Sequence, residues 1–123
     1  MNELRLGFWL IALAIVAGAF GAHGLRGAIS ASDLAIYEKA VSYQIVQGIG
    51  IILAGLLAQV GILSSAQCSR ARLMLFVGML IFCGSLYLLV LTNTRWLGAI
   101  TPIGGILMIL GWGYLGIVAK RRQ

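Results

Sequence analysis

The stretch 73–92, with the sequence LMLFVGMLIFCGSLYLLVLT, is almost entirely apolar and contains no charged side chain. A helix of this length, rising about 1.5 Å per residue, just crosses a hydrocarbon core of about 30 Å. Three other stretches without Asp, Glu, Lys or Arg share this character: 6–22, 41–63 and 96–119. Because backbone groups in lipid must find their hydrogen-bond partners within the segment, all four stretches are predicted to be membrane-spanning helices.

The composition excludes a water-soluble globule. Hydrophobic residues make up 61% of the 123 residues and charged residues 10%, whereas about 25% of the residues in a soluble domain are charged. A chain of this length is sufficient for one domain. We therefore expect residues 1–123 to form a single membrane domain, an all-α integral membrane four-helix bundle. The two cysteines, Cys68 and Cys83, are too few for a disulfide framework and are predicted to be free thiols.

The net charge of +6 has a topological explanation. Six basic residues lie at the chain ends and in the middle connection: Arg5, Arg70, Arg72, Lys120, Arg121 and Arg122. Only Arg26, Lys39 and Arg95 lie on the opposite side. Cytoplasmic segments carry the excess of Lys and Arg, so both termini are predicted to be cytoplasmic. These basic residues are not interleaved with aromatic residues on one helix face, and nucleic acid is not expected as a partner.

The first apolar stretch also admits a second interpretation. Arg5 and the small residues at 17–19 match the two ends of a cleaved signal peptide. However, the stretch 6–22 is longer than the usual apolar region of a signal peptide, and three further spans follow it. The favoured prediction is a membrane helix that is retained.

The first outer connection, 23–40, is the longest segment between spans. Ser30 or Ser32 can cap a helix whose first turn contains Asp33, since a carboxylate suits the positive helix N-terminus. We expect a helix beginning near Asp33. It is either a short interfacial helix or a direct extension of the second span.

Seventeen glycines indicate how the helices pack. Lipid removes the water-driven force between helices, so small residues that permit close approach replace it. The predicted packing positions are Gly18, Ala22, Gly50, Ala54, Gly84, Gly104 and Gly105. Pro102, the only proline, is predicted to kink the last span, with a packing role favoured over a gating hinge.

Several short motifs occur in order along the chain: GAFGAH at 18–23, Tyr43-Gln44, FCGSLY at 82–87, TPIGG at 101–105 and Gly111-Trp112. In this order and spacing they resemble the domain of unknown function 423 family. The resemblance covers nearly the whole chain. It implies a small four-helix protein of the bacterial inner membrane without an assigned activity, with relatives in mitochondria. One departure is Gln47, where family members often carry a histidine; glutamine cannot titrate and is a poor metal ligand.

The candidate site is a set of polar residues near the outer ends of the helices: His23, Tyr43, Gln44, Gln47, Ser85 and Thr101. Converging, they would form a pocket for a small ligand or a lipid headgroup. The favoured alternative is a set of hydrogen bonds between helices, each contributing roughly 0.6 to 2 kcal/mol. The lone histidine lacks Cys, Asp or Glu at ligand spacing, so no metal and no other cofactor is expected.

No pattern in the spans points to catalysis. Ser85 has no base on its helix, Cys83 has apolar neighbours, and the spans contain no carboxylate pair. The leading hypothesis is a non-enzymatic protein that acts through helix contacts, as a homo-oligomer or as an accessory subunit of a membrane complex. The alternative is a small transporter or channel for a neutral or lipid-like solute.

Overall fold

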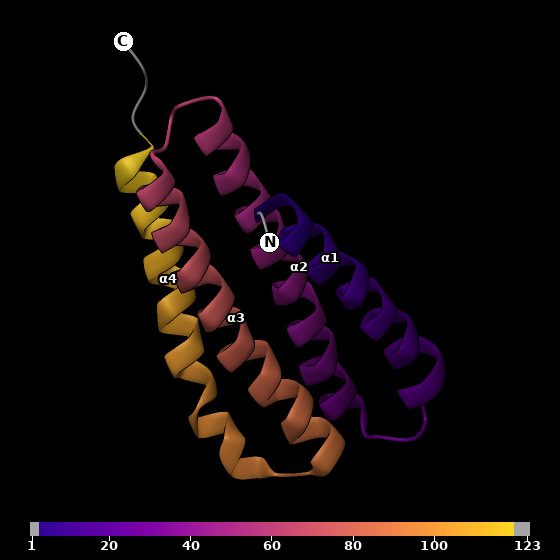
Figure 1. Ribbon diagram of the computed structural model, residues 1–123. Helices are drawn as coiled ribbons and strands as arrows, with labels where there is room; N and C mark the ends of the chain where they lie inside the picture. Colours follow the sequence, from indigo (N-terminus) through magenta and orange to yellow (C-terminus); the bar gives the residue numbers. More distant parts are fainter. Residues whose placement is uncertain (1–2, 120–123) are drawn as a thin grey trace.

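A computed structural model describes residues 3–119 and contains four long helices (Figure 1). These are α1 (Glu3–Phe20), α2 (Ala31–Gln59), α3 (Ser65–Thr92) and α4 (Thr101–Val118). A π-helical turn, η1 (Gly21–Leu25), continues α1, and a 3-10 turn, η2 (Arg95–Ala99), precedes α4. Each of the four helical segments is long and apolar enough to cross a membrane. The predicted all-α membrane architecture is confirmed, and residues 3–119 contain no named strand.

Local sequence explains where α2 and α3 begin. The Ser30 hydroxyl accepts a hydrogen bond of 3.1 Å from the Asp33 backbone and caps α2, which satisfies one of the free donors of the first turn. The helix then runs unbroken to Gln59, so of the two expected arrangements the direct extension of the second span is the one adopted. Ser64 and Gln67 form a reciprocal capping box that starts α3 well before the predicted span.

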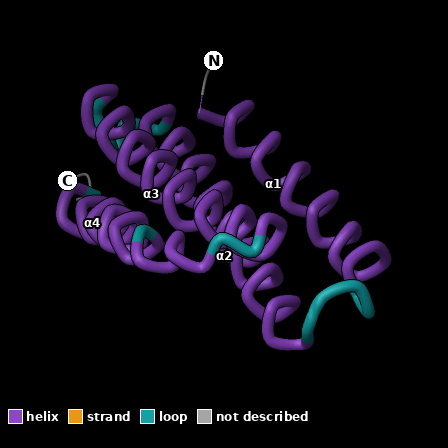
Figure 2. The backbone as a smooth tube through the Cα atoms, turned by 90° about the horizontal axis from the view of Figure 1, so that it is seen from below, coloured by secondary structure: helices purple, strands orange, loops and turns teal. Residues whose placement is uncertain are grey.

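The four helices pack in chain order rather than as a closed square. Helix α1 lies against α2, the other side of α2 packs on α3, and α3 packs on α4. Figure 2 shows α1 standing outside the group formed by α2, α3 and α4. The expected four-helix bundle is therefore open on one side, and α1 is its edge.

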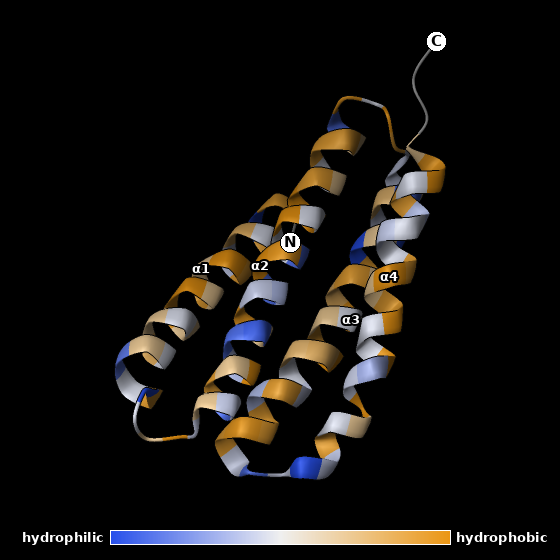
Figure 3. Ribbon diagram, turned by 180° about the vertical axis from the view of Figure 1, so that it is seen from behind, coloured by the Kyte–Doolittle hydropathy of each residue, from blue (hydrophilic) through white to orange (hydrophobic). Residues whose placement is uncertain are grey.

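The core lies between α2, α3 and α4. Its largest fully buried side chains are Ile51, Leu75, Gln47 and Cys83, whereas α1 contributes only Leu10 and Ala14 to the buried apolar set. Large apolar side chains also cover the outside of all four helices (Figure 3). In a membrane this outer surface contacts acyl chains, so its exposure carries no cost.

Ion pairs join the two hairpins, α1–α2 and α3–α4, at opposite ends of the molecule. At one end Arg72 Nη1 lies 2.7 Å from Glu3 Oε1. At the other end both terminal nitrogens of Arg95 bind both carboxylate oxygens of Asp33, at 2.8 and 2.7 Å. The second contact has the bidentate geometry that arginine offers a carboxylate.

The prediction for Pro102 was wrong in its detail. The residue lies in the first turn of α4 and not in the interior of the helix, where a proline produces a kink. The chain changes from 3-10 to α geometry at Ile100, just before it, so the proline occupies a position where its missing N–H is not needed. Thr101 Oγ1 donates to the Leu97 carbonyl at 3.3 Å and supports this junction.

Candidate functional site

The six polar residues of the candidate site do not form one cluster. Gln44 is at the centre of the first group, buried between three helices. Its Nε2 donates to the Leu10 carbonyl of α1 at 2.8 Å, and its Oε1 accepts from the Tyr87 hydroxyl of α3 at 2.8 Å. Because a carbonyl can only accept, the amide nitrogen must face α1. One side chain thus links α1, α2 and α3.

Two tyrosines extend this arrangement. The rings of Tyr37 and Tyr87 meet edge to face with centroids 5.3 Å apart, a favourable geometry for aromatic pairs. The Tyr37 hydroxyl donates to the Ala17 carbonyl at 2.6 Å. Ala17 and Leu10 are two helical turns apart on one face of α1. The Tyr37–Gln44–Tyr87 chain therefore holds α1 by its backbone carbonyls at two levels.

Gln47 belongs to a separate contact between α2 and α4. Its side chain is 2% exposed, and its Oε1 accepts a hydrogen bond of 2.8 Å from Trp112 Nε1. The indole fits against Gly50, where an added methyl group would lie 2.6 Å from a ring carbon. A buried indole N–H requires such an acceptor. Gln47 thus acts as the partner of Trp112.

Ser85 and Thr101 form a third contact, between α3 and α4. Their hydroxyl oxygens lie 2.5 Å apart and are buried. Ser85 Oγ also lies 2.9 Å from the Phe82 carbonyl of its own helix, an alternative acceptor for its single proton. The pair is an interhelical hydrogen bond of the kind expected in lipid.

His23 and Tyr43 take no part in these contacts. His23 is exposed on η1, beyond the end of α1. Tyr43 is 42% exposed and places its ring 4.7 Å from that of Phe82. The structure therefore does not bring the six residues together at His23: four of them form separate interhelical hydrogen bonds, the arrangement that was favoured over a pocket.

Some of the predicted packing positions lie in close helix contacts and others do not. Gly50, Ala54 and Gly104 lie in tight helix contacts, and a methyl group added at Gly18 would lie 3.3 Å from the Val41 side chain. A methyl group added at Gly105 would lie 3.7 Å from the Phe82 ring, an ordinary contact.

Two packing predictions were wrong: Ala22 is exposed, and nothing lies within 4 Å of a side chain at Gly84. The predicted positions Gly18 and Ala22 are four residues apart. Each step of four residues turns the side-chain position by about 40° around an ideal helix. The observed contact face instead passes through Gly7, Leu10, Ala14 and Gly21.

Tyr37, Tyr87 and Trp112 were missed as members of the polar contacts. A buried tyrosine or tryptophan needs a partner for its single donor, and that rule was the available signal. Tyr87 and Trp112 also lie within the motifs FCGSLY and Gly111-Trp112. Glycines 7 and 48 were missed as positions of close helix contact.

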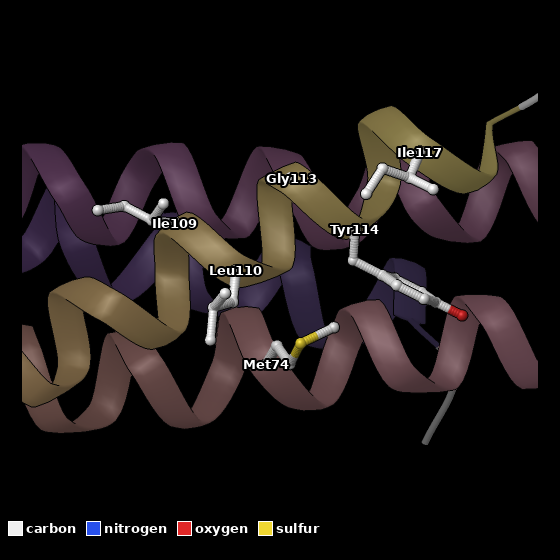
Figure 4. A pocket seen from close by; sticks show the side chains of 6 residues that line it. All are labelled: Met74, Ile109, Leu110, Gly113, Tyr114 and Ile117. Carbon is white, nitrogen blue, oxygen red and sulfur yellow. The ribbon is translucent and has the colours of Figure 1, made fainter.

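Two hollows lie away from these polar contacts. A groove of about 440 Å³ between α3 and α4 is lined by Met74, Ile109, Leu110, Gly113, Tyr114 and Ile117 (Figure 4). A second hollow of about 270 Å³ is lined by Glu3, Gly55, Ala58, Gln59, Ser65 and Cys68. Within residues 3–119 no three His, Cys, Asp or Glu side chains come together as a metal site.

Comparison with known proteins gives a consistent result. A family described as "Protein of unknown function (DUF423)" matches residues 17–105. A UPF0382 membrane protein of Staphylococcus epidermidis is 47% identical over 109 residues, which cover 89% of this chain and 87% of that protein. A UPF0382 membrane protein of Staphylococcus haemolyticus is 46% identical, with 87% and 85% covered, and one of Staphylococcus aureus is 45% identical, with 81% and 80% covered. No solved structure matches.

Proposed function

Because the chain belongs to the DUF423 family and is a multi-pass membrane protein, we propose that it acts through helix contacts without catalysing a reaction. It works either as a homo-oligomer or as an accessory subunit of a larger membrane complex.

One observation carries this proposal: the polar groups inside the spans are already used. Among the described residues, no buried side-chain nitrogen or oxygen lacks a hydrogen-bond partner. Gln44, Gln47 and Ser85 are each bonded to another helix. Buried polar groups that satisfy one another stabilise a fold and leave few donors for a substrate. This pattern supports an architectural role over a catalytic one.

The surface left over suits a partner helix. Gly84 has open space in front of it and lies on one face of α3 with Leu80, Leu88 and Leu91. A glycine between leucines one turn away on either side leaves a recess into which another helix can pack closely. This α3 face is the contact surface that we propose.

The orientation is part of the proposal. We place both termini in the cytoplasm and the protein in the bacterial inner membrane. The six-to-three distribution of basic residues supports this placement. Lys120, Arg121 and Arg122, which contribute to it, lie outside the described residues. A reporter fused to the C-terminus is expected to be active only on the cytoplasmic side, and an external signal would overturn the assignment.

The transporter alternative has less support. Its candidate residues occupy separate contacts between different helix pairs, and His23 is outside all of them. If transport occurs through these residues, Gln44→Ala combined with His23→Ala lowers solute flux into proteoliposomes. Unchanged flux would remove the reason for naming them.

Crosslinking tests the helix-contact role. Single cysteines are placed at Gly84 and, as a matched control, at Gly116, in a chain whose Cys68 and Cys83 are replaced by alanine. Both glycines have open space around them. We expect crosslinks in membranes from position 84, to a second copy or to a copurifying membrane protein, and few from position 116. A monomer in mild detergent that forms no crosslink from position 84 in membranes contradicts the proposal.

A further inference from the structure

The groove between α3 and α4 is apolar along its length and polar at one end. Its lining consists of Met74 from α3 and, from the second half of α4, Ile109, Leu110, Gly113, Tyr114 and Ile117. The hollow exists at its centre because Gly113 has no side chain and no neighbour within 4 Å. Figure 4 shows Met74 facing the α4 side chains.

A basic side chain, Arg70, and a phenolic side chain, Tyr114, lie at one end of this groove. Arg70 lies one turn before Met74 on the same face of α3. Its Nη1 is 3.4 Å from the Tyr114 hydroxyl, and its side chain is exposed. Glu3 pairs with Arg72 and Asp33 pairs with Arg95, and no ion pair joins Arg70 to a described carboxylate.

The dimensions suit a lipid tail in one leaflet. From Ile109 to Ile117 the helix rises about 12 Å. Half of a hydrocarbon core of about 30 Å is only slightly longer. The groove thus follows one leaflet from near the bilayer centre toward the surface, where Arg70 stands. Basic sites between membrane helices bind the headgroups of anionic lipids.

We propose that this groove is a binding site for an anionic phospholipid. One acyl chain lies over Gly113, between Met74 and Ile109, and the headgroup phosphate accepts hydrogen bonds from Arg70 and the Tyr114 hydroxyl. Arginine offers several donors, so it can bind the phosphate while keeping its contact with tyrosine. The site is on a different part of the surface from Gly84 and does not depend on the helix-contact role.

Native mass spectrometry of the full chain, purified in mild detergent and stripped of lipid, tests the proposal. The probes are phosphatidylglycerol and phosphatidylcholine with identical acyl chains. We expect phosphatidylglycerol to bind about fivefold more tightly, as for one basic group beside an anionic headgroup. Arg70→Gln removes this preference while leaving the phosphatidylcholine bound. Because Arg70 is exposed, this variant is expected to fold.

A second experiment fills the groove with a side chain. Gly113→Leu places a side chain where the acyl chain lies and is expected to weaken binding of both lipids. Gly116→Leu is the matched control, because Gly116 is also unobstructed but does not line the groove. Equal lipid binding by these two variants, or no preference for phosphatidylglycerol in the unmodified chain, overturns the proposal. Two further outcomes also overturn it: Gly113→Leu abolishing a dimer while lipid binding stays unchanged, or inorganic phosphate displacing the lipid.

Discussion

The two hairpins of this protein bring their helices together at glycines, but they are held together by different means. In the α3–α4 hairpin, Gly78 and Gly104 face each other, and an added methyl group at Gly104 would lie 2.6 Å from the Gly78 carbonyl oxygen. In the α1–α2 hairpin, Gly7 and Gly48 play the same part, with the corresponding distance from Gly7 to the Gly48 carbonyl 2.7 Å. The contact with the partner backbone is similarly tight in both.

The two hairpins differ in the hydrogen bonds that accompany these glycine contacts. Helix α4 is joined to α3 by Ser85–Thr101, and it also has Trp112 directed onto Gln47 of α2. Helix α1 packs on α2 and is held by bonds from Tyr37 and Gln44 to its own backbone carbonyls. Lipid offers no water-driven force to hold an edge helix. The difference teaches that the edge helix α1 is attached through its own backbone carbonyls, whereas α4 is attached through side-chain pairs to two different helices.

Gly104→Ala tests the α3–α4 hairpin and is expected to have the largest effect. The new methyl group meets the backbone of both Gly78 and Phe82, which cannot move aside as a side chain can. We expect a loss of about 3 kcal/mol in the free energy of unfolding, the upper end for overpacking. The measurement is unfolding by sodium dodecyl sulfate in mixed micelles.

The neighbouring glycine supplies the control. Gly105→Ala brings a methyl group no closer than 3.7 Å to Phe82. Alanine is favoured over glycine within a helix by about 1 kcal/mol, so this variant is expected to be as stable as the parent or more so. If the two variants behave alike, close backbone approach does not hold α3 and α4 together.

Gly7→Ala makes the corresponding change in the first hairpin. Its methyl group collides with the Gly48 carbonyl and the Ile52 side chain. Helix α1 has free space on its other side and can move away, so we expect a loss of only about 1–2 kcal/mol. Gly116→Ala, at an unobstructed position, is the control. A loss equal to that of Gly104→Ala would mean that α1 is not a movable edge.

Gln44→Leu examines the hydrogen bonds that distinguish the first hairpin. It leaves the Tyr87 hydroxyl without its acceptor and removes the donor to the Leu10 carbonyl. Such bonds in membranes contribute about 0.6 kcal/mol on average and up to about 1.7 kcal/mol. Because Gln44 makes two of them, we expect a loss of about 1 kcal/mol or more.

A double-mutant cycle with Tyr87→Phe separates the two bonds of Gln44. We expect Tyr87→Phe to cost less in the Gln44→Leu background than alone, since its partner is already gone. Gln47→Leu with Tyr87→Phe is the control pair, because Gln47 bonds Trp112 instead. Strictly additive losses for Gln44 and Tyr87 would show that their contact is not energetically coupled.

The four helices could be predicted from the sequence because the need to satisfy backbone hydrogen bonds in lipid applies to each apolar stretch separately. A charge-free stretch such as 73–92 must be helical in lipid whatever its neighbours do. The start of α2 was also accessible, since Ser30 and Asp33 are close in sequence and their capping bond is local. Pro102 shows the limit: apolar character continues through 96–100, so composition could not reveal that this segment is a 3-10 turn.

The candidate site was harder to predict because it depends on which helices are neighbours. Gln44 and Ser85 were correctly recognised as polar residues that could bond between helices. Their grouping with His23 supposed that positions near the outer ends of four antiparallel helices converge. Helix α1 instead packs at the edge, and η1 carries His23 to an exposed position. Helix order around a bundle depends on contacts such as Gly7 with Gly48, which only the three-dimensional arrangement identifies.

Arg72→Gln is expected to have the smallest effect on the free energy of unfolding. It tests whether an ion pair also holds α1 to α3. Arg72 binds Glu3 at 2.7 Å, with side-chain exposures of 31% and 25%. A partly exposed ion pair of this kind contributes less than about 1 kcal/mol. Its contribution should decrease as salt is raised, because salt screens such pairs. Unfolding is therefore measured at low and high ionic strength.

Arg70→Gln is the matched control, since it removes the same charge from the same helix but breaks no ion pair with a described carboxylate. The salt-dependent difference between the two variants isolates the Glu3 contact from the general loss of positive charge. A loss for Arg72→Gln as large as that for Gln44→Leu would change the comparison of the hairpins. Helix α1 would then be held across to α3 at its first turn, and its bonds to α2 would not be its main attachment.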